Sequence, residues 1–97
     1  MDSATHGPVR GRDLRYLLTL VLQQSDRPLS VAELVTILEQ RGHAIDGRPS
    51  KAVSDALRWE IGRGRVIRVG RSSYLRGRVP RSTLSFIRSH LGDRHAA

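Results

Sequence analysis

An abrupt change of periodicity between residues 48 and 76 constrains the fold more than any other feature of the chain. Over residues 49–62 the apolar residues recur at helical spacing, and two glycines, Gly62 and Gly64, then interrupt the pattern. Residues 66–69 are rich in β-branched side chains, residues 70–72 favour a turn, and residues 73–76 favour a returning strand. The sequence therefore predicts a helix that is followed at once by a β-hairpin.

Positive charge is concentrated in the same part of the chain. Ten basic residues lie between positions 48 and 81, with only two acidic residues, Asp55 and Glu60, so this stretch carries 10 − 2 = +8, which equals the net charge of the whole chain. Compositional bias could raise the number of arginines without any function, but bias alone would scatter them along the chain. The clustering therefore favours a polyanionic partner. The ten basic residues are Arg48, Lys51, Arg58, Arg63, Arg65, Arg68, Arg71, Arg76, Arg78 and Arg81.

The size and composition fit one small domain. A chain of 97 residues can build one hydrophobic core, and the absence of cysteine excludes disulfides, thiolate metal sites and cysteine nucleophiles. The longest apolar run, residues 17–22, is far shorter than the roughly 20 residues of a membrane span, and residues 1–8 contain no apolar signal segment. We therefore expect a soluble, cytoplasmic protein, associated with the nucleoid if it binds DNA, and no membrane partner.

The residues that precede position 48 predict two helices. Residues 1–11 are polar and contain Gly and Pro, as is typical of a flexible arm, and residues 12–25 carry an apolar stripe at helical spacing. Ser30 and Glu33 form a capping-box pattern at the start of the second helix, with Leu29 and Leu34 at the positions of a hydrophobic staple. Gly42 is expected to end this helix in the left-handed conformation.

The connection to the third helix and the C-terminal segment complete the expected architecture. Ile45 is expected to enter the core, and Pro49 suits the first position of the third helix. Residues 79–92 predict a last helix, capped by Ser82 or Thr83, which either folds back on the first helix or pairs with a second chain in a homodimer. Residues 93–97 are expected to be frayed. The fold class is thus α+β and mostly α.

The third helix has two different sides. The residues expected to pack inward are Val53, Ala56, Leu57 and Ile61. Lys51, Ser54, Asp55, Arg58 and Gly62 fall on the other side, and this small, basic surface suits entry into a major groove about 12 Å wide. Asp55 repels phosphate and could instead pair with Arg58 or accept from a cytosine amino group. Trp59 is expected to pack against the hairpin rather than stack on a base.

This order of elements resembles a winged helix-turn-helix DNA-binding domain of the kind found in small bacterial transcription regulators. The resemblance covers residues 12–77, within an expected domain at 12–78, and rests on the opening Leu-Ser-Val-Ala-Glu-Leu of the second helix and the Arg-Val-Gly-Arg-x-x-Tyr-x-Leu of the hairpin. It implies that the third helix is the recognition helix and that the hairpin is a wing that contacts the backbone or minor groove.

Double-stranded DNA binding, by a transcription regulator or a nucleoid-associated protein, is therefore the expected function. The expected DNA-binding residues are Arg48, Ser50, Lys51, Ser54, Arg58, Arg63, Arg65, Arg68, Arg71, Ser72 and Arg76. The alternative is a winged helix that docks an acidic protein partner; RNA binding is less favoured because aromatic residues are few (4%).

No enzymatic activity, catalytic residue, cofactor or metal is expected. The histidines are not near a recognisable catalytic arrangement, and the glycines at 62 and 64 lie between a helix and a strand, which is the wrong context for a dinucleotide-binding loop. His90, Asp93 and His95 are expected to be solvated rather than metal-bound.

Overall fold

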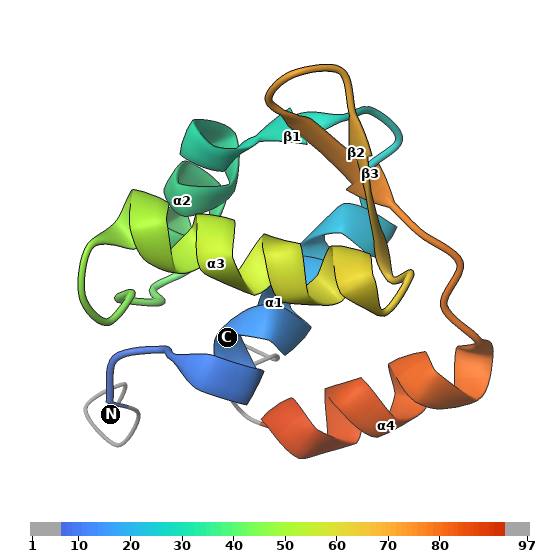
Figure 1. Ribbon diagram of the computed structural model, residues 1–97. Coiled ribbons are helices and arrows are strands. Elements are labelled where there is room, and N and C mark those ends of the chain that lie inside the picture. Colours follow the sequence, from blue (N-terminus) through green and yellow to red (C-terminus); the bar gives the residue numbers. More distant parts are fainter. Residues whose placement is uncertain (1–6, 93–97) are drawn as a thin grey trace.

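The computed structural model describes residues 7–92, which form a small, mostly helical α+β domain with four helices and a three-stranded antiparallel sheet (Figure 1). Residues 1–6 and 93–97, on which most of the predicted arm and the predicted frayed tail fall, lie outside the described residues. No helix among residues 7–92 is long and apolar enough to cross a bilayer. The elements are α1 (Gly11–Gln23), β1 (Leu29–Ser30), α2 (Val31–Gln40), α3 (Pro49–Gly62), β2 (Val66–Val69), β3 (Ser73–Arg76) and α4 (Arg81–Leu91).

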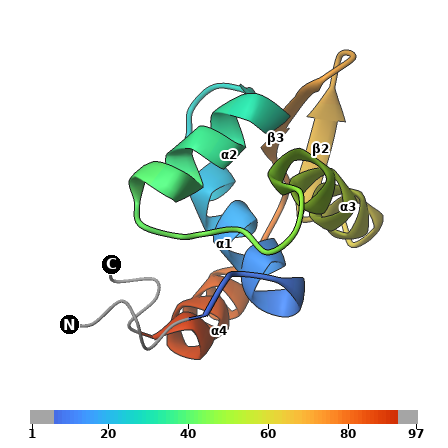
Figure 2. The same ribbon diagram turned by 90° about the vertical axis from the view of Figure 1, so that its left-hand side faces the viewer.

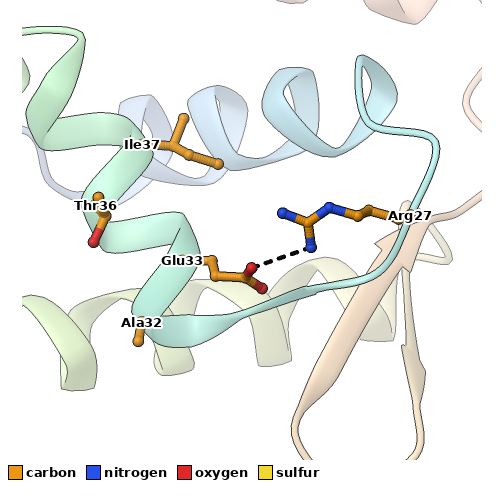
Figure 3. A pocket seen from close by; sticks show the side chains of 5 residues that line it. All are labelled: Arg27, Ala32, Glu33, Thr36 and Ile37. Atoms are coloured by element: carbon orange, nitrogen blue, oxygen red, sulfur yellow. Dashed lines mark hydrogen bonds and ion pairs between the residues drawn. The ribbon is translucent and has the colours of Figure 1, made fainter.

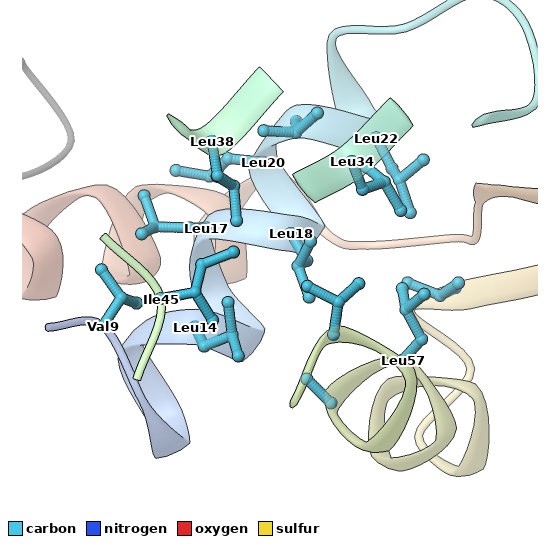
Figure 4. Close-up of a cluster of buried hydrophobic side chains, with 14 of the residues drawn as sticks. Val9, Leu14, Leu17, Leu18, Leu20, Leu22, Leu34, Leu38, Ile45 and Leu57 are labelled. Atoms are coloured by element: carbon cyan, nitrogen blue, oxygen red, sulfur yellow. The ribbon is translucent and has the colours of Figure 1, made fainter. Parts of the chain in front are cut away.

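Helix α1 is the centre of the core. It contacts α2, α3, α4 and β3, so its apolar side chains are buried around much of its circumference (Figure 4). Leu18 and Leu22 are fully buried, as are Leu34 of α2 and Leu57 of α3. The broad leucine stripe in the sequence therefore reflects a helix that other elements cover on several sides.

Both ends of α2 form as the sequence predicts. The Ser30 hydroxyl accepts from the Glu33 N–H at 3.1 Å, and the Glu33 carboxylate accepts from the Ser30 N–H at 2.9 Å. At the other end Gly42 has φ +87°, and the N–H groups of Gly42 and His43 donate to the carbonyls of Glu39 and Leu38, which is a Schellman motif.

The segment before α1 is more ordered than the predicted flexible arm. Val9 is buried and forms a parallel bridge with Ile45, which enters the core as predicted. The Val9 N–H donates to Ala44, and the Val9 carbonyl accepts from Asp46. The prediction of a flexible arm over residues 1–11 was wrong for Val9, because its buried side chain and its two backbone hydrogen bonds hold it against residues 44–46.

The inward side of α3 differs from the predicted side by one position. Val53, Ala56 and Leu57 are buried as predicted, but the fourth buried residue is Glu60, whereas Ile61 is 36% exposed. Both residues lie about two turns after Val53, so periodicity alone does not choose between them.

The sheet has the order β1-β3-β2 and contains the predicted hairpin. Val66 pairs with Arg76 and Val69 with Ser73, and residues 70–72 form the turn, with Gly70 at φ +69°. Strand β1 was not predicted; it is two residues long and pairs with β3, Leu29 opposite Tyr74. The hairpin is thereby tied to the start of α2.

Helix α4 folds back on α1, which is one of the two predicted arrangements. Ile87 and Leu91 are buried, and α4 contacts α1. The predicted cap was wrong: the helix begins at Arg81, after Pro80, and no side chain caps it. Phe86 stays 56% exposed beside Tyr16, with a centroid separation of 6.4 Å.

Gly77 follows β3 and allows the chain to pass close to the turn that follows α3. Its N–H donates to the Arg65 carbonyl at 2.9 Å, and a Cβ at this position would lie 2.2 Å from the Gly64 carbonyl oxygen. The close approach is between two backbone segments, so neither side can move without disturbing the hairpin.

We predict that Gly77→Ala lowers the free energy of unfolding by about 1–3 kcal/mol, because the added methyl overlaps the backbone. Urea unfolding measures the change. Gly62→Ala is the matched control, since a Cβ there meets nothing within 4 Å and its φ is not positive. Equal stability of Gly77→Ala and wild type would contradict the predicted overlap.

Candidate nucleic-acid interface

The chain after α3 contains no acidic residue up to the end of α4. Residues 61–92 include eight arginines and neither Asp nor Glu. Only one of the eight, Arg65, forms an ion pair within residues 7–92, and its partner is Glu60 of α3. A segment with so many uncompensated guanidinium groups has a strong positive potential.

Helix α3 and the hairpin lie on the same side of the domain. Figure 1 shows α3 across the front with the hairpin rising from its C-terminal end, and Figure 2 shows both at one edge, with α2 on the opposite side. The side chains that α3 exposes and those of the hairpin are therefore available to one large ligand.

The outward face of α3 carries a carboxylate between two cations. Asp55 accepts from Lys51 Nζ at 2.9 Å and from an Arg58 guanidinium N–H at 3.2 Å. The Lys51 hydrogen bond is the largest cause that holds the pKa of Asp55 below its usual range. Of the two possibilities raised for Asp55, the ion pair with Arg58 is present, together with a second pair to Lys51. The three side chains carry a net +1, so the face stays basic.

The tip of the hairpin is held by one of its own arginines. The Arg68 Nε donates to the Arg71 carbonyl at 3.1 Å, and a second N–H of Arg68 donates to the same oxygen. Arg71 and Ser72 are exposed at the turn, and Arg71 makes no ion pair within the described residues. Arg68 therefore shapes the turn, whereas the Arg71 guanidinium is left available.

Beneath this surface Glu60 is fully buried and ion-paired. Arg65 Nε donates to Glu60 Oε1 at 2.7 Å and Arg65 Nη2 to Oε2 at 3.1 Å, and the Thr19 hydroxyl donates to Oε1 at 2.8 Å. These hydrogen bonds from Arg65 to Glu60 raise the pKa of Arg65 above its usual value. Arg15 Nε is 3.7 Å from Oε2 and is buried without a hydrogen bond within the described residues. The carboxylate of Glu60 on α3 thus interacts both with α1 and with the residue that precedes β2.

Trp59 lies next to this cluster and is 49% exposed. The Arg15 guanidinium carbon is 4.5 Å from its ring centroid and the Arg63 carbon is 5.1 Å away, distances at which a cation interacts with an aromatic face. The ring was expected to pack against the hairpin; it is about half exposed, and two guanidinium groups lie over it.

The structure brings most of the predicted site residues to the exposed side of α3 and the hairpin. Arg65 is the exception, because its bidentate pair with Glu60 occupies its guanidinium, and Ser54 is half-buried. Arg76 is exposed and donates to the Gln23 carbonyl at 3.4 Å, at the end of α1. The predicted residues that are exposed are Arg48, Ser50, Lys51, Arg58, Arg63, Arg68, Arg71, Ser72 and Arg76.

The sequence reasoning missed the roles of Glu60, Thr19 and Arg15. A partial signal was present, since Glu60 and Ile61 both lie about two turns after Val53 and either can occupy the inward stripe. A buried carboxylate requires a partner, and Arg63 and Arg65 both follow the helix closely, so the sequence offers two candidates without choosing between them. Arg15 and Thr19, which are one turn apart on a distant helix, could not be assigned from local sequence.

A surface hollow is present away from α3 and the hairpin. It lies against the outer side of α2, where Arg27 and Glu33 form an ion pair of 3.1 Å beside Ile37 (Figure 3). Hydrogen bonds to the Glu33 carboxylate keep its pKa below the usual range; the bond from the Ser30 N–H contributes most, and the bond from Arg27 comes second. No group of three or more potential metal ligands occurs among residues 7–92, and Asp93 and His95 lie outside them.

We predict that Glu60→Gln lowers the free energy of unfolding by about 3 kcal/mol, because it leaves Arg65 and Arg15 without a countercharge. Denaturant unfolding at neutral pH measures the change. Glu39→Gln is the matched control, as Glu39 is exposed on α2, and its effect should stay within about 0.5 kcal/mol. If the two variants are equally stable, Glu60 does not hold these elements together.

Comparison with protein-family models, curated proteins and solved structures found no match to this chain. What it binds is therefore inferred from its own residues. Those residues present an arginine-rich surface over α3 and the hairpin, with few carboxylates to neutralise it.

Proposed function

We propose that the chain binds double-stranded DNA, as a transcription regulator or a nucleoid-associated protein. The observation that carries the proposal is the set of exposed arginines contributed by α3, by the turn after it and by the hairpin, elements that lie together at one edge of the domain in Figure 2. Neutralising DNA phosphates with such residues releases counterions and gives most of the affinity of a non-specific complex.

We infer further that the domain is a winged helix. The order of elements on which the resemblance rested is present, with three helices followed by a hairpin and the hairpin beside the C-terminal end of α3. In this arrangement α3 lies in the major groove and the hairpin is the wing. A helix with its side chains is about 10–12 Å across, which fits the groove.

We expect α3 and the hairpin to contact different parts of the DNA. Lys51 and Arg58 on α3 are about seven residues apart, so they reach two places along the groove. Arg71 at the turn of the wing contacts the phosphate backbone or the minor groove. Arg48 and Arg63 flank α3 at its two ends and neutralise phosphates on either side of the groove.

An acidic protein partner is the alternative, and salt dependence separates the two. A duplex releases condensed counterions, whereas a folded acidic protein has no comparable atmosphere. No observation on the described residues favours the protein partner over DNA.

We predict that the chain binds a duplex of about 25 base pairs with a log–log salt slope between about −4.5 and −6.3, as expected for five to seven neutralised phosphates at about −0.9 each. Fluorescence anisotropy at several salt concentrations measures it. Arg58→Ala and Arg71→Ala should each weaken binding and reduce the slope by about one.

Arg41→Ala is the matched control for these two variants. Arg41 is the residue that follows α2, a helix that contributes none of the proposed DNA-binding residues, and its loss removes the same charge. Equal weakening by all three variants would mean that overall charge, rather than this surface, drives binding. Absence of binding at about 50 mM salt would refute DNA as the partner.

A further inference from the structure

Asp55 is an unusual residue for a surface that faces phosphates. It is half exposed at the middle of the outward face of α3, and no other acidic side chain is exposed on α3. It lines two adjacent hollows, one with Arg48 and Lys51 and the other with Arg15 and Trp59. A carboxylate here weakens phosphate binding, so its position calls for a separate explanation.

The two ion pairs of Asp55 orient the carboxylate without saturating it. Lys51 donates to one carboxylate oxygen and Arg58 to the other, from the preceding and the following turn of the helix. An ionised carboxylate has about four acceptor positions, two on each oxygen. One position on each oxygen therefore remains, and the flanking cations offset the repulsion between this carboxylate and nearby phosphates.

We propose that Asp55 reads a base edge, by accepting a hydrogen bond from the exocyclic amino group of a cytosine in the major groove. This inference rests on the proposed DNA binding and adds sequence preference to it. A carboxylate can only accept, so guanine and thymine, which present acceptors at the corresponding position, are repelled. Adenine offers an amino group beside the N7 acceptor, so it is a weaker partner than cytosine.

Lys51 and Arg58, the cations beside Asp55, can contact the base pair that Asp55 contacts or the adjacent pair. Arg58 can donate in a bidentate fork to O6 and N7 of a guanine, and Lys51 can donate to the same edge. A carboxylate between two cations thus complements a cytosine next to guanines. The domain should prefer a site with at least one C·G pair under the centre of α3.

Selection from duplexes with a randomised core, followed by anisotropy on the selected duplex and its single-pair variants, tests the inference. For the wild type we expect a C·G pair at one position, and about fivefold or more loss of affinity when that pair is replaced. Asp55→Asn should lose this preference and gain one for adenine, because an amide can pair with both N6 and N7. Thermal unfolding verifies that the variant is folded.

Glu39→Gln is the matched control, since it makes the same charge change on α2 and should keep the wild-type preference. Selection of the same sequence by Asp55→Asn and wild type, or no base preference in the wild type, would overturn the role of Asp55 while leaving DNA binding intact. Failure of the wild type to bind any duplex at low salt would overturn the proposed function itself, and this inference with it.

Discussion

The buried carboxylate of Glu60 is the interaction on which the arrangement of α1, α3 and the hairpin depends. It is fully buried, and it is held by Arg65 at the start of the hairpin and by Thr19 and Arg15 of α1. A carboxylate without these partners would be too costly to bury, so the elements that supply them must meet at this point. The turn after α3 contributes as well, because the N–H of Arg65 donates to the Glu60 carbonyl.

This constraint also divides the arginines by role. Arg65 and Arg15 pair with the buried Glu60. Arg68 donates to the carbonyl of Arg71 in the hairpin turn, and Arg76 donates to a carbonyl at the end of α1. The remaining basic side chains of α3 and the hairpin are free to meet a ligand or share Asp55. The basic surface is therefore smaller than the charge of the sequence suggests, and its shape is fixed by the fold.

Local signals predicted the elements that depend on local interactions. The capping box, the glycine at the end of α2, Pro49 at the start of α3 and the two strands of the hairpin all follow from residues close in sequence, and all are present. Strand β1 is defined by its pairing with β3, and Val9 is held by residues 44–46, so neither could be predicted from neighbouring sequence. The candidate site was partly predictable. Helical periodicity indicates which side chains of α3 are exposed, but it does not indicate which side chains Arg65 contacts.

We propose that α3 and the hairpin form one surface for duplex DNA, and the decisive measurement follows amide chemical shifts during titration with a duplex at low salt. We expect the largest changes on exposed residues of α3, such as Lys51 and Arg58, and on Arg71 and Ser72 of the hairpin turn, with little change on α2 and α4. Changes concentrated on α2 or α4, or no changes at all, would contradict this proposal.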